Sequence, residues 1–284
     1  MKHIVSFSGG MGSFAEAYYC VQEFGKENVL LIFADTLMED PDLYRFKDEV
    51  VAFLGCELVT LTHGQNIWEL FEDKRFMGNR LMDICSSQLK RDLLIAYIKD
   101  NYTTTEYVPI IHKGKILKTK AGKIHCNKKI IASCEVHLGI DFSEYHRLTR
   151  TQEYMKPIPY RSLLVERGLI VRKDFSEQFG IKRPYLYTLG FGHNNCGGMC
   201  VKAGLGQFKL FYEKLPERYL WNEEQEQKVI AVGGLPFLSL TRNGKEIYLT
   251  MREFRQEFIE TGQAEQYKYD IGGCACALPL PEGG

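Results

Sequence analysis

A glycine-rich turn near the start of the chain constrains its fold more than any other feature. An apolar run, His3 to Val5, leads into the turn, and a helical pattern, Phe14 to Tyr19, follows it. A strand, a glycine-rich turn and a helix in this order expose backbone N–H groups at the positive end of the helix dipole. We therefore predict an α/β fold whose first turn binds phosphate; an ordinary strand-to-helix turn is the alternative. The residues predicted to bind the nucleotide here are Ser6, Ser8, Gly9, Gly10, Met11, Gly12 and Ser13.

Composition limits the other functions of the chain. It has 284 residues, with 36 Lys and Arg against 36 Asp and Glu, so any role with nucleic acid needs a local basic patch. No apolar run approaches the roughly 20 residues that cross a bilayer, and the N-terminal residues lack the pattern of an export signal. Nine cysteines in such a chain favour thiols or metal ligands over disulfides. We expect a cytoplasmic protein without a membrane partner.

Polar residues follow the second apolar run, Asn28 to Phe33, whose continuous apolarity is typical of a buried parallel strand. Asp35 and Thr36 come directly after it, at the same sheet edge as the glycine turn. A carboxylate there could accept a ribose hydroxyl or help to hold Mg²⁺, so Asp35 is predicted both to bind the nucleotide and to take part in catalysis. A helix N-cap is the alternative for both residues.

A third polar group, Cys85 to Lys90, lies at the start of a predicted helix. Cys85 would lie where the helix dipole lowers the pKa of a thiol, and a small buried side chain is the alternative. The loop before Lys90 should face the same sheet edge. We predict Cys85 and Lys90 as catalytic residues.

A basic insertion separates the third and fourth predicted strands. The interval from Glu106 to Glu135 contains no acidic residue, and alternation around His112 with the turn Ala121-Gly122 indicates a projecting hairpin. Such an arm could contact nucleic acid; a solvated loop is the alternative. Its lysines are Lys113, Lys115, Lys118, Lys120, Lys123, Lys128 and Lys129.

Two glycine-flanked cysteine pairs lie in the C-terminal part, Cys196 with Cys200 and Cys274 with Cys276. Glycines permit the tight reversals that bring two thiolates onto one ion, and four soft ligands suit Zn²⁺ or an iron–sulfur cluster such as [4Fe–4S]. Four free thiols are the alternative. His193 could replace one cysteine or donate to a substrate phosphate.

The glycine turn resembles the Ser-Gly-Gly-x-Asp-Ser loop of the PP-loop superfamily, which contains ATP pyrophosphatases and sulfonucleotide reductases. Gly12 stands where that loop usually has Asp. Asp35-Thr36 is similar to the Asp-Thr-Gly segment of phosphoadenosine phosphosulfate (PAPS) reductases, with Leu37 in place of the glycine. The resemblance implies a Rossmann-like parallel sheet of about five strands flanked by helices.

Further segments resemble the same PAPS reductase-like family. Cys85 to Lys90 is similar to its Cys-x4-Lys segment, whose basic residue contacts the nucleotide or a substrate anion. A strand ending in Gly-Ile, followed by Glu144, is also similar, which implies Asp141 and Arg147 as nucleotide contacts; a cap or a surface charge is the alternative for each. Some related sulfur-transfer enzymes carry an iron–sulfur cluster, which favours a cluster at the cysteines.

The expected organisation is a nucleotide-binding α/β domain over residues 1–180, with the basic hairpin at about 107–131, and a small cysteine-rich α+β region over 181–284. The resemblance implies an enzyme that binds ATP with Mg²⁺ and adenylates a substrate for sulfur or nitrogen transfer, with a sulfur donor protein as a partner. The alternatives are a PAPS or APS reductase and a non-catalytic nucleotide- or nucleic-acid-binding module with a structural Zn²⁺. The acceptor and the oligomeric state do not follow from the sequence.

Overall fold

A five-stranded parallel sheet forms the centre of the protein in a computed structural model that describes residues 1–79, 81–242 and 244–269. The strand order is β3-β2-β1-β8-β9, and each neighbouring pair is parallel. The strands are β1 (Lys2–Ser6), β2 (Val29–Asp35), β3 (Glu57–Thr62), β8 (Cys134–Leu138) and β9 (Tyr160–Arg161). The predicted α/β class with a sheet of about five parallel strands is therefore confirmed.

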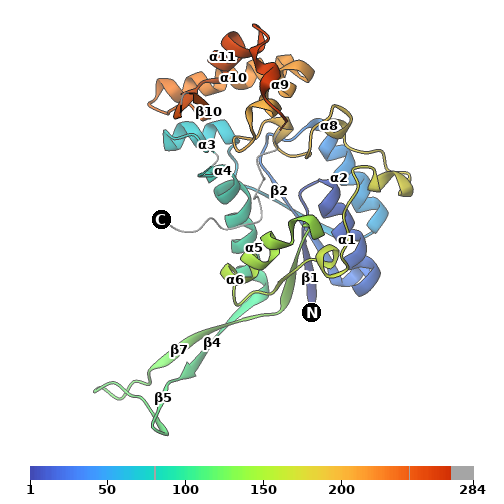
Figure 1. Cartoon of the computed structure of the whole chain (residues 1–284). Helices are drawn as coiled ribbons and strands as arrows, with labels where there is room; N and C mark the ends of the chain where they lie inside the picture. Colours follow the sequence, from blue (N-terminus) through green and yellow to red (C-terminus); the bar gives the residue numbers. More distant parts are fainter. Residues whose placement is uncertain (80, 243, 270–284) are drawn as a thin grey trace.

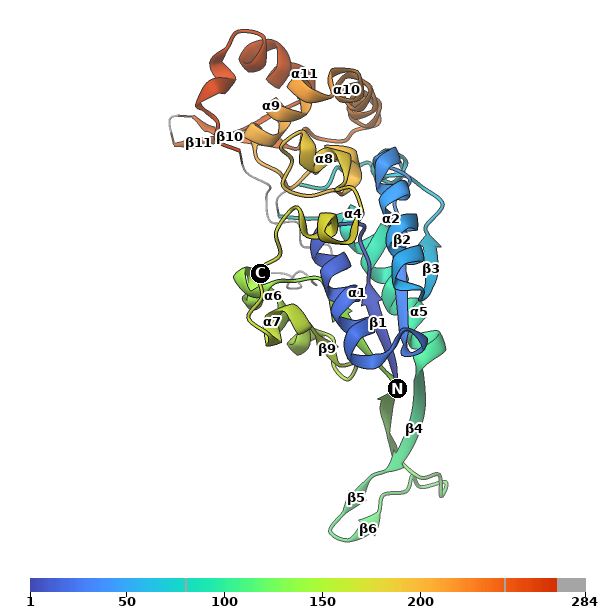
Figure 2. The ribbon, with the colours of Figure 1, turned by 90° about the vertical axis from the view of Figure 1, so that its right-hand side faces the viewer.

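Helices cover both faces of this sheet (Figure 2). The four long ones are α1 (Met11–Phe24), α2 (Pro41–Leu54), α5 (Asp92–Tyr102) and α6 (Tyr145–Tyr154). Side chains of β1 alternate between the faces, as a pleated strand requires. Val5 packs with Phe14 of α1 and Phe46 of α2, whereas Ile4 packs with Leu94 of α5 on the other face.

Short helical segments connect these elements, and their local sequences explain where several begin. Asn66 and Glu69 form a reciprocal capping box at α3, and Pro41 occupies the first turn of α2, where its missing N–H costs nothing. The segments are η1 (Lys26–Asn28), α3 (Ile67–Lys74), α4 (Ile84–Ser86), the π-helix η2 (Ser87–Arg91), η3 (Phe142–Glu144), α7 (Leu163–Glu166), η4 (Phe175–Phe179), α8 (Tyr185–Thr188) and η5 (Cys196–Gly198).

The C-terminal region forms a cap of helices with one hairpin above the carboxyl edge of the sheet (Figure 1). Its elements are α9 (Leu205–Lys214), α10 (Pro216–Ala231), β10 (Leu238–Arg242), β11 (Lys245–Leu249), α11 (Met251–Phe254), the π-helix η6 (Arg255–Ile259) and η7 (Gln263–Gln266). Phe208, Tyr219 and Phe254 share one hydrophobic core with Trp68 and Phe71 of α3. The cap is thus packed on the first part of the chain rather than around a core of its own.

A long antiparallel arm extends from the sheet at the end opposite the C-terminal cap (Figures 1 and 2). Its stalk is β4 (Thr103–Pro109) paired with β7 (Cys126–Ala132), and its tip carries β5 (Ile111–His112) paired with β6 (Lys115–Ile116). All seven lysines between positions 113 and 129 are exposed. In the part of the chain that the structure describes, no helix has the length and apolarity needed to cross a membrane.

Candidate functional site

A cavity of about 240 Å³ lies at the carboxyl edge of the sheet, between the loops that follow β1 and β8. The chain leaves β1 toward β2 and β3 on one side, and β8 and β9 lie on the other, so the topology reverses here. Open α/β sheets bind ligands at such a switch point. Seven of the predicted nucleotide contacts line this cavity, namely Ser6, Ser8, Gly10, Met11, Gly12, Ser13 and Arg147.

The glycine turn is held in shape by its own serines. The Ser13 hydroxyl donates to the Gly10 carbonyl at 2.9 Å and accepts from the Ser8 amide at 3.2 Å. Gly9 adopts a positive φ of 73°, which favours glycine, and its carbonyl accepts from the Asn194 side chain. The Ser13 proton is committed to Gly10, and the Met11 amide donates to the Tyr187 hydroxyl at 3.2 Å. The first-turn amides left to donate to an anion are those of Gly12 and Ser13, which have no intrahelical acceptor.

The backbones of Gly12 and Gly139 are in direct contact. A Cβ added to Gly12 would lie 2.5 Å from the Gly139 carbonyl oxygen, and one added to Gly139 would lie 2.4 Å from the Ser13 amide nitrogen. Neither position can carry a side chain unless the backbone shifts. This contact between α1 and the end of β8 is the physical reason why an aspartate is not accommodated at position 12.

Three cations line the cavity: Lys90 and Arg91 from η2, and Arg147 from α6. Single π-helical turns interrupt α-helices frequently at functional sites, and this one carries two of the three cations. Arg147 is paired with Glu144, which also lines the cavity. The arrangement gives the cavity the charge that an anionic ligand requires.

Glu39 connects three segments beside the cavity. Its side chain is only 1% exposed and accepts from the Lys90 ammonium at 3.3 Å, from the Thr36 hydroxyl at 3.0 Å and from the Cys196 amide at 2.5 Å. The same ammonium lies 3.8 Å from Cys196 Sγ. Glu39 is not among the predicted site residues, although it belongs to an acidic run after Asp35 that resembles a segment of PAPS reductases.

Asp35, Thr36 and Asp141 lie at the predicted edge, but none is among the described residues that line the cavity. Asp35 Oδ1 accepts from the Leu37 amide and from the Tyr44 hydroxyl. Both oxygens of Asp141 accept hydrogen bonds, one from the Ser143 amide and hydroxyl and the other from the Val171 amide. Asp141 therefore acts as the cap of η3, the alternative that the sequence left open.

Three consecutive polar residues, His193, Asn194 and Asn195, form part of the cavity wall. Each is buried at its unpartnered atom: His193 Nε2 and the Oδ1 atoms of both asparagines have no hydrogen-bond partner among the described residues. Burial and, next, the nearby Lys90 lower the pKa of His193 to about 4, so its imidazole is neutral. Unpartnered buried polar atoms are costly, and a polar ligand in the cavity would satisfy them.

The described cysteines of the predicted metal site lie directly beside the cavity. Cys196 and Cys200 are each 8% exposed and belong to the hydrophobic core that α3 shares with the C-terminal cap. Cys85 packs against that core and is not among the residues that line the cavity. Gly197 and Gly198 have φ values of 58° and 93° and reverse the chain between the two thiols. This half of the donor set fits a soft metal ion or a cluster; Cys274 and Cys276 lie outside the described residues.

Comparison with protein-family models gives a match in the first part of the chain. Residues 2–106 match the family model described as the phosphoadenosine phosphosulfate reductase domain. No curated protein matches the chain in a sequence search. The matched residues contain the glycine turn, β2 with Asp35, Glu39 and the η2 segment with Lys90. Over these residues the chain is similar to that domain, a family of the PP-loop superfamily.

Proposed function

We propose that the protein is an enzyme that binds an adenine nucleotide, ATP in first place, and splits it between the α and β phosphates. A substrate oxygen attacks the α phosphorus, pyrophosphate leaves, and the adenylated substrate is then open to sulfur or nitrogen transfer. The observation that carries the proposal is the first turn of α1, which opens into a cavity lined by Lys90, Arg91 and Arg147 at the switch point of the sheet.

In this reaction the first-turn amides of α1 hold the pyrophosphate portion, and the cations neutralise the charge that develops on it. Glu39 is a positioning residue, because it fixes the Lys90 ammonium between the cavity and the cysteine loop. The neutral imidazole of His193 and the amides of Asn194 and Asn195 are candidates for contacts with the adenosine or the acceptor. Mg²⁺ bound with the nucleotide would neutralise phosphate charge, and Asp35 is the proposed carboxylate that would hold it.

The cysteine site is proposed to hold a [4Fe–4S] cluster or Zn²⁺ through Cys196, Cys200, Cys274 and Cys276. When bound, a cluster would supply the redox or sulfur-handling chemistry of a sulfur transfer, whereas Zn²⁺ would be structural. The Lys90 ammonium lies 3.8 Å from Cys196 Sγ and donates a hydrogen bond to it. Anaerobic purification with iron, sulfide and zinc analysis decides between them, and a colourless protein with one zinc would exclude the cluster.

The exposed lysines of the arm support a nucleic acid as the carrier of the acceptor group. They lie on the arm, which projects away from the cap, so a polyanion can approach them without displacing packed elements (Figure 1). Phosphate contacts of this kind would make binding strongly dependent on salt.

The second candidate is a sulfonucleotide reductase, which the matched family and the thiol beside Lys90 favour. The two reactions release different products. The purified protein is incubated with ATP, or with PAPS and a dithiol that supplies the two electrons of the reduction, alone and with candidate acceptors. AMP, pyrophosphate and sulfite are measured. Release of AMP and pyrophosphate supports the proposal, and release of sulfite supports the reductase. If no mixture yields these products, the remaining candidate is a non-catalytic nucleotide-binding module.

A further inference from the structure

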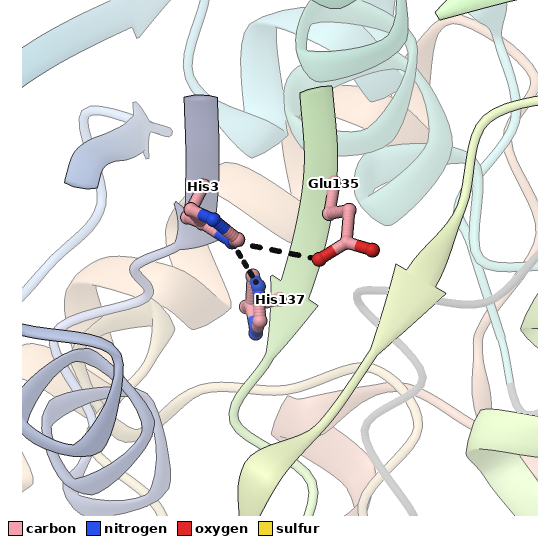
Figure 3. Close-up of side chains that lie close together, drawn as sticks. All are labelled: His3, Glu135 and His137. Atoms are coloured by element: carbon pink, nitrogen blue, oxygen red, sulfur yellow. Dashed lines mark hydrogen bonds and ion pairs between the residues drawn. The ribbon is translucent and has the colours of Figure 1, made fainter. Parts of the chain in front are cut away.

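A cluster of three potential metal ligands, two of them buried, lies on β1 and β8 before the residues of these strands that line the cavity. His3 of β1 pairs in register with Glu135 of β8, and His137 lies two residues further along β8, so all three side chains project from one face. Figure 3 shows the two imidazoles and the carboxylate converging. His3 Nδ1 lies 3.2 Å from His137 Nε2 and 3.5 Å from Glu135 Oε2.

These separations match those of ligands around one ion. At metal–ligand distances of about 2.0–2.1 Å, tetrahedral geometry places neighbouring ligand atoms about 3.3 Å apart. All three ligand atoms lie within 4.8 Å of one another. Two imidazoles and one carboxylate, with a further position open to water, are a donor set that zinc and similar divalent ions accept.

A fourth side chain orients the cluster from behind. His137 Nδ1 lies 3.1 Å from Glu16 Oε1, and both side chains are fully buried. Glu16 accepts hydrogen bonds from the Leu163 and Leu164 amides, which fix the position of its side chain. An N–H donated to Glu16 leaves the Nε2 lone pair of His137 facing His3 and Glu135. Histidines that bind metals almost always donate their second nitrogen to a carboxylate or carbonyl in this way.

Two carboxylates flank the cluster, and they are the groups that a cation would contact. Glu16 and Glu135 supply them, and the guanidinium of Arg161 is shared between Glu135 and Glu166. The N-terminal ammonium also acts on His3, so a bound ion would meet charges of both signs.

We propose that His3, Glu135 and His137 form a site for a divalent transition metal of the zinc class that joins β1 to β8. The site is distinct from the cavity and from the cysteine pair, since none of its residues lines either. Ion binding places the proton of His3 on Nε2, so that Nδ1 and His137 Nε2 both offer lone pairs. Bound to neighbouring strands, the ion stabilises the centre of the sheet.

Cobalt titration of the metal-free full chain tests the proposal, because thiolate ligands give intense near-ultraviolet charge-transfer bands and His and Glu ligands do not. Wild-type protein is compared with His3→Gln and Glu135→Gln, and with His63→Gln, which removes an exposed histidine, as the control. We expect the two ligand variants to bind one cobalt ion fewer, to lose weak visible bands but no charge-transfer intensity, and to lose thermal stabilisation by zinc. Equal stoichiometry and equal zinc stabilisation in all four proteins would overturn the proposal.

Since His3 and Glu135 lie near the surface end of the cluster, both variants are expected to fold, and far-ultraviolet circular dichroism checks this. If neither ligand variant folds, a variant with Cys196→Ser and Cys200→Ser, which keeps the three proposed ligands, is titrated instead. It must still bind one cobalt ion without charge-transfer bands, and failure to do so also overturns the proposal.

Discussion

Replacing Gly12 by alanine tests the close contact on which the phosphate turn depends. The new Cβ would lie 2.5 Å from the Gly139 carbonyl oxygen, about 0.9 Å short of the 3.4 Å at which ordinary contact begins. Overpacking of this kind costs about 1–3 kcal/mol, and alanine recovers about 0.5–1 kcal/mol as a better helix former. The net expectation is a loss of about 1–2 kcal/mol in the free energy of unfolding, or a fall of several degrees in Tm.

The matched control is Gly10→Ala in the same turn. Its φ is −96°, and its added Cβ would meet nothing closer than the Tyr187 hydroxyl at 3.4 Å, so stability should change little. Thermal and urea unfolding of the three proteins measure the difference. The backbone shift that the new Cβ forces also moves the first-turn amides of α1. We therefore expect Gly12→Ala to lower the affinity for nucleotide as well as the stability. A Gly12→Ala protein as stable as wild type would refute the contact, and with it the explanation for the missing aspartate.

Three further outcomes follow from buried or exposed charge. Burial raises the pKa of Glu226 to about 8, so the folded protein keeps a proton that the unfolded chain releases near 4.5. The free energy of unfolding is therefore highest below pH 4.5 and falls as the pH rises toward 8, by up to about 1.4 kcal/mol per pH unit. Urea unfolding at several pH values measures this slope, and Glu226→Gln should flatten it. Lys202→Met leaves the fully buried Asp83 without its cation and should lower the free energy of unfolding by about 3–5 kcal/mol. Adding Asp83→Asn to this variant should restore a part of the loss. Equal stability of the wild-type protein and both variants would contradict the importance of this ion pair. Changing the seven arm lysines to glutamine should leave Tm unchanged, whereas the slope of log K against log salt for nucleic acid should fall by about 0.9 per lost phosphate contact; an unchanged slope would argue against the arm.

Local sequence patterns predicted those helices and strands that the residues of a single segment specify. The continuous apolar run before Asp35 became β2, and the helical pattern from Phe14 to Tyr19 lies within α1. Strand β9 has two residues, too few for a periodic pattern, so it could be expected only as a member of the sheet.

Contacts between distant residues could not be predicted. Gly12 approaches Gly139 just after β8 ends at Leu138, and no periodicity encodes this contact. Glu39 acquires its role only when the 35–40 loop meets the cysteine loop, more than 150 residues later. His3 and His137 likewise meet only because β1 and β8 are neighbours in the sheet.

Titration calorimetry of ATP into the full-chain protein tests the central claim most directly, namely that the cavity binds an adenine nucleotide through its phosphates. Charged hydrogen bonds contribute about 1.5–3 kcal/mol each, so Lys90→Gln and Arg147→Gln should each weaken binding about tenfold or more. Pyrophosphate should compete with ATP, and Lys99→Gln, an exposed change on α5, should leave the affinity unchanged. Absence of ATP and PAPS binding, or equal affinity in all these proteins, would contradict the account.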